Sequence, residues 1–234
     1  SFKMERIPTD THIRNLLDPV SPYELSDEFP FLLGQLADSG YLSQWHVLDR
    51  RLAFSLDGVY YFCSKKISCA NCQKQEHEHG TVYLHSAITP VVVAPGQPHV
   101  LPYVPEFITP QDGTEKQDCE INAAKRWVER EATVLRQHRA ILLGDDLYSR
   151  QPLCEKVLSS GLDFIFVCHR ESHPALYNIV DAIANLGRLA CFSQRRWNGR
   201  HGEIWTYRFL NNPPLRAGED ALSCLLYTSP SPRD

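Results

Sequence analysis

The first half of the chain passes from helical to strand-like spacing of its apolar residues. Within residues 1–48, a capping signal around Thr9 precedes apolar positions at helical spacing, and residues 29–42 form a second amphipathic stretch that ends near Gly40. Three runs rich in Val, Ile and aromatic residues follow. These runs predict three successive antiparallel strands, at residues 51–63, 81–94 and 99–108.

The second half alternates between helical and strand patterns. Residues 117–139 give the clearest helix, because apolar residues occupy one face and charged residues cover the other. Such alternation predicts that the later strands join the sheet in parallel. The expected elements are strands at 141–144 and 162–168, helices at 151–160 and 174–186, and a final hairpin formed by 189–192 and 203–210 across a basic turn.

Two acidic residues occupy matching places in this pattern. Asp57 stands in the first strand, just after the apolar run 51–55, and Asp145, with Asp146 beside it, follows the fourth strand. Three antiparallel strands, a helix and a parallel fourth strand make a ribonuclease H-like mixed sheet, in which the first and fourth strands are neighbours. Two carboxylates at such an edge repel unless cations neutralise them, and two divalent cations would clamp the reacting oxygens of a phosphodiester. We therefore expect a Mg²⁺ or Mn²⁺ site here, although Asp57-Gly58 is also a common turn signal.

A second candidate metal site lies in the hydrophilic loop between the first two strands. Its residues are spaced Cys63-x5-Cys69-x2-Cys72-x4-His77. Cys-x2-Cys followed closely by His is zinc-ligand spacing, and structural Zn²⁺ takes four ligands in a tetrahedron. Cys69, Cys72 and His77 are the expected ligands, and an exposed, reduced loop with chance histidines is the alternative. The fourth ligand stays open among Cys63, His79, His85 and Cys119.

The amino-acid composition is that of an ordinary globular protein. The 234 residues are 43% hydrophobic and 22% charged, as in ordinary globular proteins, and no apolar run approaches the roughly 20 residues of a membrane helix. A net charge of -4 argues against a general basic coat for nucleic acid, and contacts with DNA are then expected to be local. The candidates for contacts with DNA phosphates, which could equally be solvated surface, are Lys65, Lys66, Arg195, Arg196 and Arg200.

The eight cysteines do not suggest a disulfide framework, because no secretory signal accompanies them. Three of them, Cys154, Cys168 and Cys191, stand in apolar or helical surroundings. We expect these three to be buried thiols that act as small hydrophobic side chains.

Several blocks of the sequence resemble the DDE-type transposases of bacterial insertion sequences. The blocks are 7–18, 56–72, 111–127 and 144–149, and the resemblance extends over about residues 3–223. It implies a ribonuclease H-like catalytic domain that cleaves and transfers DNA strands with two Asp and one Glu holding two Mg²⁺ ions. It also implies double-stranded DNA as partner (element ends and target), a homo-oligomer on that DNA and a cytoplasmic, nucleoid-associated location.

The resemblance assigns Asp57 as the first acid and Asp145 as the second, because the acid of the family stands two residues before the position of Leu147. Asp146 is then expected to support the metal ligands or to cap the next helix. The third acid of such enzymes is a Glu on a helix after a β-rich insertion. Neither Glu203, before a strand-like run, nor Glu219, in a loop, fits that description.

The resemblance to the transposases stops after residue 223. Residues 224–234 resemble a translated sequencing adapter, a Pro- and Ser-rich tail with no reason to fold. We therefore expect a truncated and inactive fragment. Two other functions remain open, a ribonuclease H-like metal nuclease and a non-enzymatic, zinc-stapled DNA-binding module. The expected domains are a helical segment at 1–48, a catalytic core at 49–188, the start of a β-rich insertion at 189–223 and a non-native tail at 224–234.

Overall fold

The protein has mixed α/β structure with five α-helices among its described residues. A computed structural model describes residues 7–78, 80–109, 119–197, 199–200, 202–211 and 213–215. Within these ranges, no helix is long and apolar enough to cross a membrane. The chain forms two compact units, which are Ser1–Leu143 with Lys156–Ile165 (unit 1) and Gly144–Glu155 with Phe166–Asp234 (unit 2).

Unit 1 begins with the two expected helices. Thr9 caps α1 (Asp10–Leu17) by accepting a hydrogen bond from the His12 backbone N–H. Helix α2 (Glu28–Asp38) ends four residues earlier than the apolar pattern predicts, because Gly40 adopts a left-handed conformation with φ 75°. The short 3-10 turn η2 (Tyr41–Trp45) continues the apolar pattern after the helix and buries Leu42 and Trp45.

The main sheet of unit 1 is mixed, as the sequence predicted. Strand β2 (Arg51–Ser55) lies between β6 (Val91–Val93), which runs antiparallel to it, and β9 (Ile141–Gly144), which runs parallel to it. The register pairs Ser55 with Leu143, and Leu56 N–H donates a hydrogen bond to the Leu143 carbonyl. The strand order is β10 (Asp163–Phe166), β9 (Ile141–Gly144), β2 (Arg51–Ser55), β6 (Val91–Val93), β7 (Leu101–Pro102), and β1 (His46–Val47) also pairs with β2.

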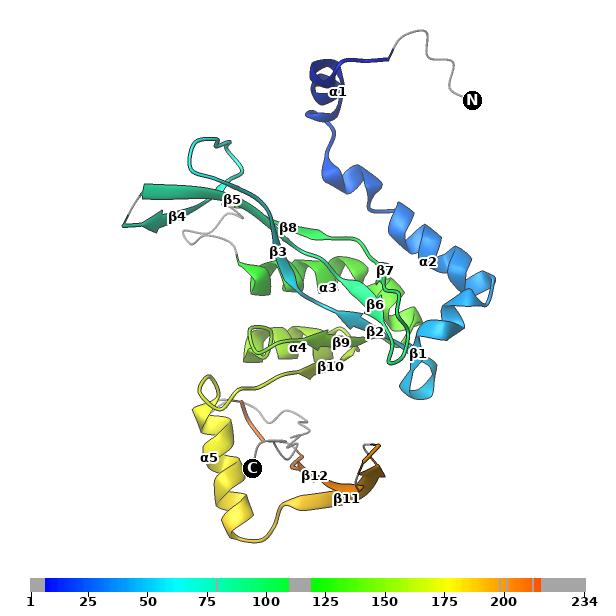
Figure 1. Ribbon diagram of the computed structural model, residues 1–234, viewed down its shortest axis with the longest axis vertical. Coiled ribbons are helices and arrows are strands. Elements are labelled where there is room, and N and C mark those ends of the chain that lie inside the picture. Colours follow the sequence, from blue (N-terminus) through cyan, green and yellow to red (C-terminus); the bar gives the residue numbers. More distant parts are fainter. Residues whose placement is uncertain are drawn as a thin grey trace. The chain divides into compact units, whose positions relative to one another are not determined.

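Each of the three predicted antiparallel strands is divided in two, and the outer halves form a second sheet. The first strand breaks at Asp57, and the second breaks at Thr89 and Pro90, where proline lacks an N–H for a ladder hydrogen bond. Strands β3 (Gly58–Ser64) and β4 (Gln73–His77) both pair antiparallel with β5 (Gly80–Ile88). These three strands extend past helix α3 (Glu120–Gln137) and form what we call the β-arm (Figure 1). The strands of this sheet are β3 (Gly58–Ser64), β4 (Gln73–His77), β5 (Gly80–Ile88) and β8 (Glu106–Ile108).

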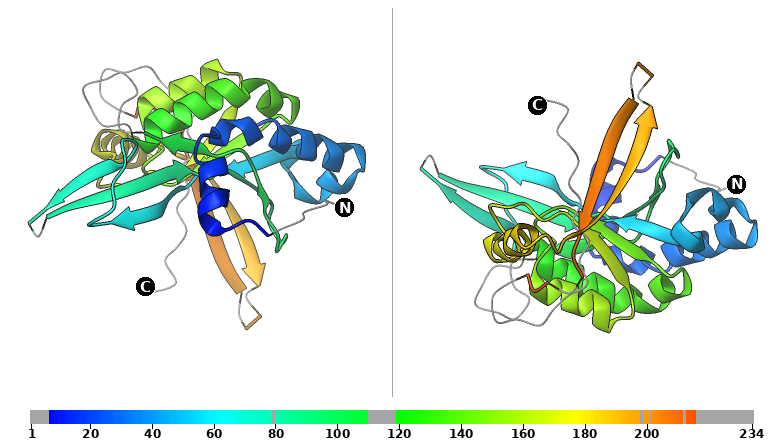
Figure 2. Two further views of the ribbon diagram at one scale, coloured as in Figure 1. Left: turned by 90° about the horizontal axis from the view of Figure 1, so that it is seen from above. Right: turned by 90° about the horizontal axis from the view of Figure 1, so that it is seen from below.

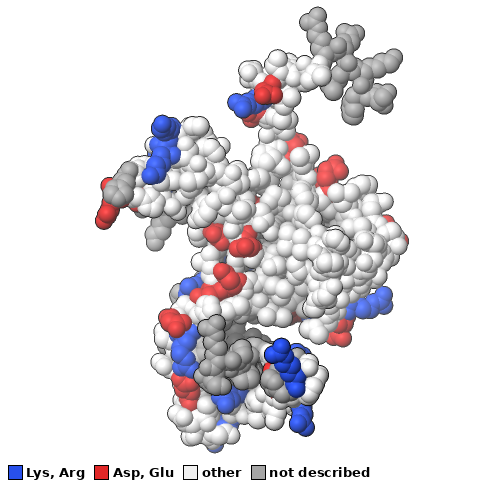
Figure 3. Space-filling model, in the orientation of Figure 1, with Lys and Arg blue, Asp and Glu red and all other residues white. Residues whose placement is uncertain are grey.

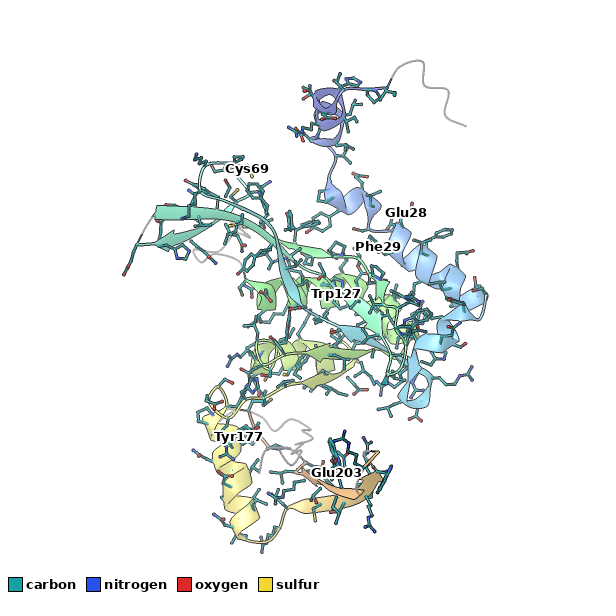
Figure 4. The ribbon with its side chains drawn as sticks, in the orientation of Figure 1. Glu28, Phe29, Cys69, Trp127, Tyr177 and Glu203 are labelled. Carbon is teal, nitrogen blue, oxygen red and sulfur yellow. The ribbon has the colours of Figure 1, made fainter. Side chains whose placement is uncertain are left out.

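Helix α3 (Glu120–Gln137) covers one face of the sheets of unit 1 (Figure 2). Its apolar face buries Trp127 completely, and the indole Nε1–H donates a 2.9 Å hydrogen bond to the Val104 carbonyl (Figure 4). The Trp127 ring also contacts Phe54 of β2 and Tyr103, with ring centroids 6.1 Å apart in both cases. This packing fixes α3 against the strand that leads to Asp57.

Unit 2 contains the final helix and the expected hairpin. Helix α4 (Gln151–Ser159) begins in unit 2, and α5 (Pro174–Asn185) carries Pro174 in its first turn, where the missing N–H costs nothing. Strands β11 (Ala190–Trp197) and β12 (Gly202–Phe209) pair antiparallel along their whole length. Strand β11 therefore continues through the basic residues that the sequence pattern assigned to the turn.

The prediction of three buried thiols is confirmed at one position and wrong at another. Cys154 is fully buried on α4, and Cys168 is half-buried, which raises the pKa of its thiol above the usual value. Cys191 is exposed, because every residue of the two-stranded β11 is exposed. Apolar neighbours in sequence do not bury a thiol when the strand has no layer packed over it.

Candidate metal centre

Two thiols and one imidazole converge at the base of the loop between β3 and β4, on which Figure 4 labels Cys69. The Cys69 and Cys72 Sγ atoms lie 3.6 Å apart, and each lies 3.3 Å from His85 Nε2. The three atoms all lie within 4.8 Å of one another. Among the residues that the structure describes, this is the one set of three or more Cys, His, Asp or Glu ligand atoms so close together.

Local backbone hydrogen bonds shape the loop that carries the two cysteines. Cys72 N–H donates to the Cys69 carbonyl at 3.2 Å, and Cys69 N–H donates to Cys72 Sγ at the same distance. At the start of the loop, Ser64 Oγ accepts hydrogen bonds from the N–H groups of Lys66 and Ile67. These bonds turn the chain tightly, so that both sulfurs face the same point.

The strand register brings His85 to that point. In β5, Leu84 pairs with Gln73 of β4, so the next position across from His85 is that of Cys72. On the other side of β5, His85 pairs with Phe62 of β3. A histidine thirteen residues beyond Cys72 thus becomes its spatial neighbour.

Aromatic rings surround the imidazole on the β-arm. The Tyr61 ring stacks on His85 at 5.7 Å between centroids with 21° between the planes, and Phe62 lies at 5.4 Å. Cys72 is buried, whereas Cys69 is exposed. Partial burial raises the pKa of the Tyr61 hydroxyl, and the nearby Cys69 and Cys72 sulfurs raise it further when they are negatively charged. The site is therefore covered on one side and accessible at Cys69.

The structure replaces one expected ligand with another. His77 is the last residue of β4 and pairs with Gly80 at the turn, about 16 Å along the strand from Cys72 at ~3.3 Å per residue. Cys63 on β3 and Cys119 before α3 are exposed and do not join the group of three. His79 lies outside the described residues. His85, which the sequence offered only as one candidate for the fourth position, stands where His77 was expected.

Asp57 lies at the bend between β2 and β3 and is exposed. Its carbonyl accepts a 2.9 Å hydrogen bond from Thr89 N–H, which fixes the backbone at the point where the two halves of each strand separate. A Cβ atom added to Gly58 would lie 2.3 Å from Glu120 Cδ, so the Glu120 carboxyl group fills the space beside this residue. Sequence reasoning missed Glu120, because no spacing rule links the start of α3 to Asp57.

Asp145 and Asp146 differ in their surroundings within unit 2. Asp145 is exposed, and its Oδ1 accepts a 2.9 Å hydrogen bond from Leu147 N–H. Asp146 accepts hydrogen bonds from His169 N–H at 2.6 Å and from Ser172 Oγ at 2.5 Å. Asp146 therefore anchors the segment before α5, where the sequence suggested support for metal ligands or a cap for the next helix.

The carboxyl group of Asp146 is also held in its charged form. Partial burial alone would raise its pKa, but the hydrogen bonds from Ser172 and His169 N–H lower the pKa below the usual value. The Oδ1 atom lies 3.3 Å from His173 Nε2, which in turn lies 2.6 Å from Ser149 Oγ. Asp146 is thus part of a structural network inside unit 2.

The candidate DNA-contacting residues lie in two places. Lys65 and Lys66 are exposed in the loop between β3 and β4. Arg195 and Arg196 are exposed on β11, where the Arg196 guanidinium lies 5.5 Å from the Trp205 ring centroid, and Arg200 stands in the turn of the hairpin. On the face seen in Figure 3, Lys and Arg side chains occur in separate groups.

The two residues considered for a third acid have different outcomes. Glu203 lies in β12, in agreement with the strand-like pattern, and its Oε2 accepts a hydrogen bond from Trp205 Nε1 at 3.1 Å. Glu219 lies outside the described residues.

Comparisons of the chain with models of protein families, with curated proteins and with solved structures found no match.

Proposed function

We propose that this chain carries the catalytic core of a DDE-type DNA transposase, in which Asp57 and Asp145 bind Mg²⁺ or Mn²⁺. The register of the main sheet is the observation that supports the proposal most. Ser55 pairs with Leu143 in parallel strands, and each of these residues stands two positions before one of the two acids. The strand order β10-β9-β2-β6-β7 agrees with a ribonuclease H-like core, in which the first and fourth strands are neighbours.

The residues fit a hard divalent cation in their chemistry. Mg²⁺ and Mn²⁺ prefer carboxylate oxygens, and both Asp57 and Asp145 are exposed carboxylates at the ends of strands. When bound, such ions would activate water against a DNA phosphodiester and then the freed 3′-hydroxyl against target DNA. The role of Asp57 and Asp145 is to hold the ions. The hydrogen bond from Thr89 N–H to the Asp57 carbonyl keeps the backbone of Asp57 in place.

Double-stranded DNA is the partner in this proposal, and a homo-oligomer forms on that DNA. Lys65 and Lys66 on the β-arm and the arginines of β11 are the candidate phosphate contacts. Loss of one such residue would weaken DNA binding by a similar factor for all sequences and would reduce its dependence on salt.

Mn²⁺ titration of the full chain tests the metal-binding part of the proposal. The variants are Asp57→Asn and Asp145→Asn, and Asp38→Asn on α2 is the control because Asp38 is also an exposed acid of a well-defined element. We expect each of the first two variants to weaken Mn²⁺ binding at least about tenfold, which is about 1.4 kcal/mol, and the control to leave it unchanged.

Unchanged Mn²⁺ affinity in both Asp57→Asn and Asp145→Asn would overturn the proposal. If DNA binding then persisted in the same variants, the chain would be a non-enzymatic binding module. This alternative has one observation in its favour, the cluster of Cys69, Cys72 and His85.

A further inference from the structure

We propose that Cys69, Cys72 and His85 bind a Zn²⁺ ion that fastens the β3–β4 loop to strand β5 of the β-arm. This inference does not depend on the transposase proposal, because it involves neither of the two aspartates. It rests on the distances between the three ligand atoms, on their chemistry and on the sparse packing of the β-arm.

The distances match those that a tetrahedral Zn²⁺ ion would impose. Bonds of about 2.3 Å to sulfur and about 2.05 Å to nitrogen place two sulfurs about 3.8 Å apart and a sulfur and a nitrogen about 3.6 Å apart. The corresponding distances here are 3.6 Å between the sulfurs and 3.3 Å from each sulfur to His85 Nε2. Movements of a few tenths of an ångström would therefore accommodate the ion.

A disulfide would require a different arrangement. Two bonded sulfurs lie about 2.05 Å apart, whereas the Cys69 and Cys72 sulfurs are separated by 3.6 Å. A disulfide would also give His85 Nε2 no partner of its own, although this atom lies equally close to both sulfurs. The arrangement of the three atoms around one point thus favours a shared ion.

The donor set selects zinc over the hard cations of the aspartate site. Thiolates and imidazole are ligands for Zn²⁺, whereas Mg²⁺, Mn²⁺ and Ca²⁺ favour oxygen. No further Cys, His, Asp or Glu ligand atom joins the three within the part of the chain that the structure describes. The group of three therefore supplies three of the four ligands of a tetrahedral Zn²⁺ ion.

A metal link would stabilise the β-arm, because few of the side chains on β3 and β4 are buried. Only Gln73 is buried in β4, and Tyr60, Tyr61 and Ile67 are each at least 55% exposed. Strands β3 and β4 bury almost no apolar residue and gain little from packing, so a metal that joins their loop to β5 would contribute a large share of their order. The ion would tie the ends of β3 and β4 together through β5, because His85 pairs across to Phe62 and follows Leu84, the partner of Gln73.

Elemental analysis of the full chain, purified under reducing conditions without chelator, tests the proposal directly. We expect about one zinc per chain in the wild type and a loss of most of it in Cys69→Ser, Cys72→Ser and His85→Asn. Cys63→Ser and His77→Asn are matched controls, because both residues stand on the same β-arm but outside the group of three. These controls should keep the metal.

Cobalt substitution gives a second measurement. Co²⁺ in this site should show thiolate charge-transfer absorption and intense visible bands typical of tetrahedral coordination. His85→Cys supplies a third thiolate at the same position, so it should retain Co²⁺ and increase the charge-transfer absorption. A gain of signal in this variant cannot arise from misfolding, which separates loss of a ligand from loss of structure.

Three outcomes would overturn the proposal. The wild type could contain no zinc and take up no Co²⁺ while its thiols are reduced. A Cys69–Cys72 disulfide could be present in the purified protein in place of the metal. Alternatively, His77→Asn could lose the metal while His85→Asn keeps it, which would restore the ligand set expected from sequence spacing.

Discussion

Replacement of Trp127 by Phe should destabilise unit 1 by about 3 kcal/mol. The indole Nε1–H donates to the Val104 carbonyl, and Val104 is 1% exposed, so the carbonyl would lose a partner that water cannot replace. A buried polar group without a partner costs about 1–3 kcal/mol. The smaller ring also removes two carbons from a fully buried site, at about 0.8 kcal/mol each.

Urea unfolding followed by far-UV circular dichroism and by fluorescence measures this loss. Trp197→Phe is the control, because Trp197 is 70% exposed on β11 and its replacement should change stability by less than about 0.5 kcal/mol. Since the chain forms two units, the transitions from both probes should be compared before a two-state analysis is applied.

A loss below about 1 kcal/mol for Trp127→Phe would refute the reasoning, since it would mean that α3 does not depend on this contact. The same substitution should also affect the proposed Mg²⁺ or Mn²⁺ site at Asp57. Trp127 packs on Phe54 in β2, three residues before Asp57, so Trp127→Phe should weaken Mn²⁺ binding more than Trp197→Phe does. Equal effects of the two substitutions would show that this packing does not position Asp57.

Three further outcomes are expected. Removal of metal by a chelator should speed trypsin cleavage after Lys65 and Lys66 by about tenfold or more, and unchanged cleavage would show that the loop is ordered without metal. Burial, and then nearby His46, lower the pKa of His138, so stability should fall as pH drops below about 6.5, and His138→Gln should remove this slope in urea titrations. The pKa of Asp146 is lowered in the folded state, so its contribution to stability is complete above about pH 4 and is lost as the pH falls through the folded-state pKa. Asp146→Asn should therefore be less stable than the wild type by about 1–3 kcal/mol at pH 7, measured by thermal unfolding.

Local pattern predicted the α-helices and most of the strands in their order, but not β4 (Gln73–His77), which lies in the stretch that was expected to be a hydrophilic loop. Strand β9 begins and ends where the apolar run predicts, and α3 carries its buried residues on the face that the sequence indicates. The division of the long strands was not predicted, because it arises where Asp57, Thr89 and Pro90 bend neighbouring strands at the same level. A single strand pattern does not contain information about its neighbours.

The metal ligands show the same limit more sharply. Spacing identified Cys69 and Cys72, which lie within one turn of chain, and their contact follows from local hydrogen bonds. His85 joins them only through the pairing of β4 with β5, and a shift of that register by one residue would turn His85 to the other face of the sheet. Glu120 beside Gly58 is likewise set by the packing of α3 on the sheet.

The β3 strand separates Asp57, one residue of the proposed Mg²⁺ or Mn²⁺ site, from the proposed zinc site of the β-arm. Asp57 precedes β3, whereas His85 pairs with Phe62, about 16 Å along the strand at ~3.3 Å per residue. Carboxylate oxygens favour Mg²⁺ or Mn²⁺ and the thiolates favour Zn²⁺, so neither ion should displace the other. Loss of zinc should therefore disturb the β-arm and its loop lysines but leave Mn²⁺ affinity at Asp57 intact, because β2 and α3 hold that end of the strand independently.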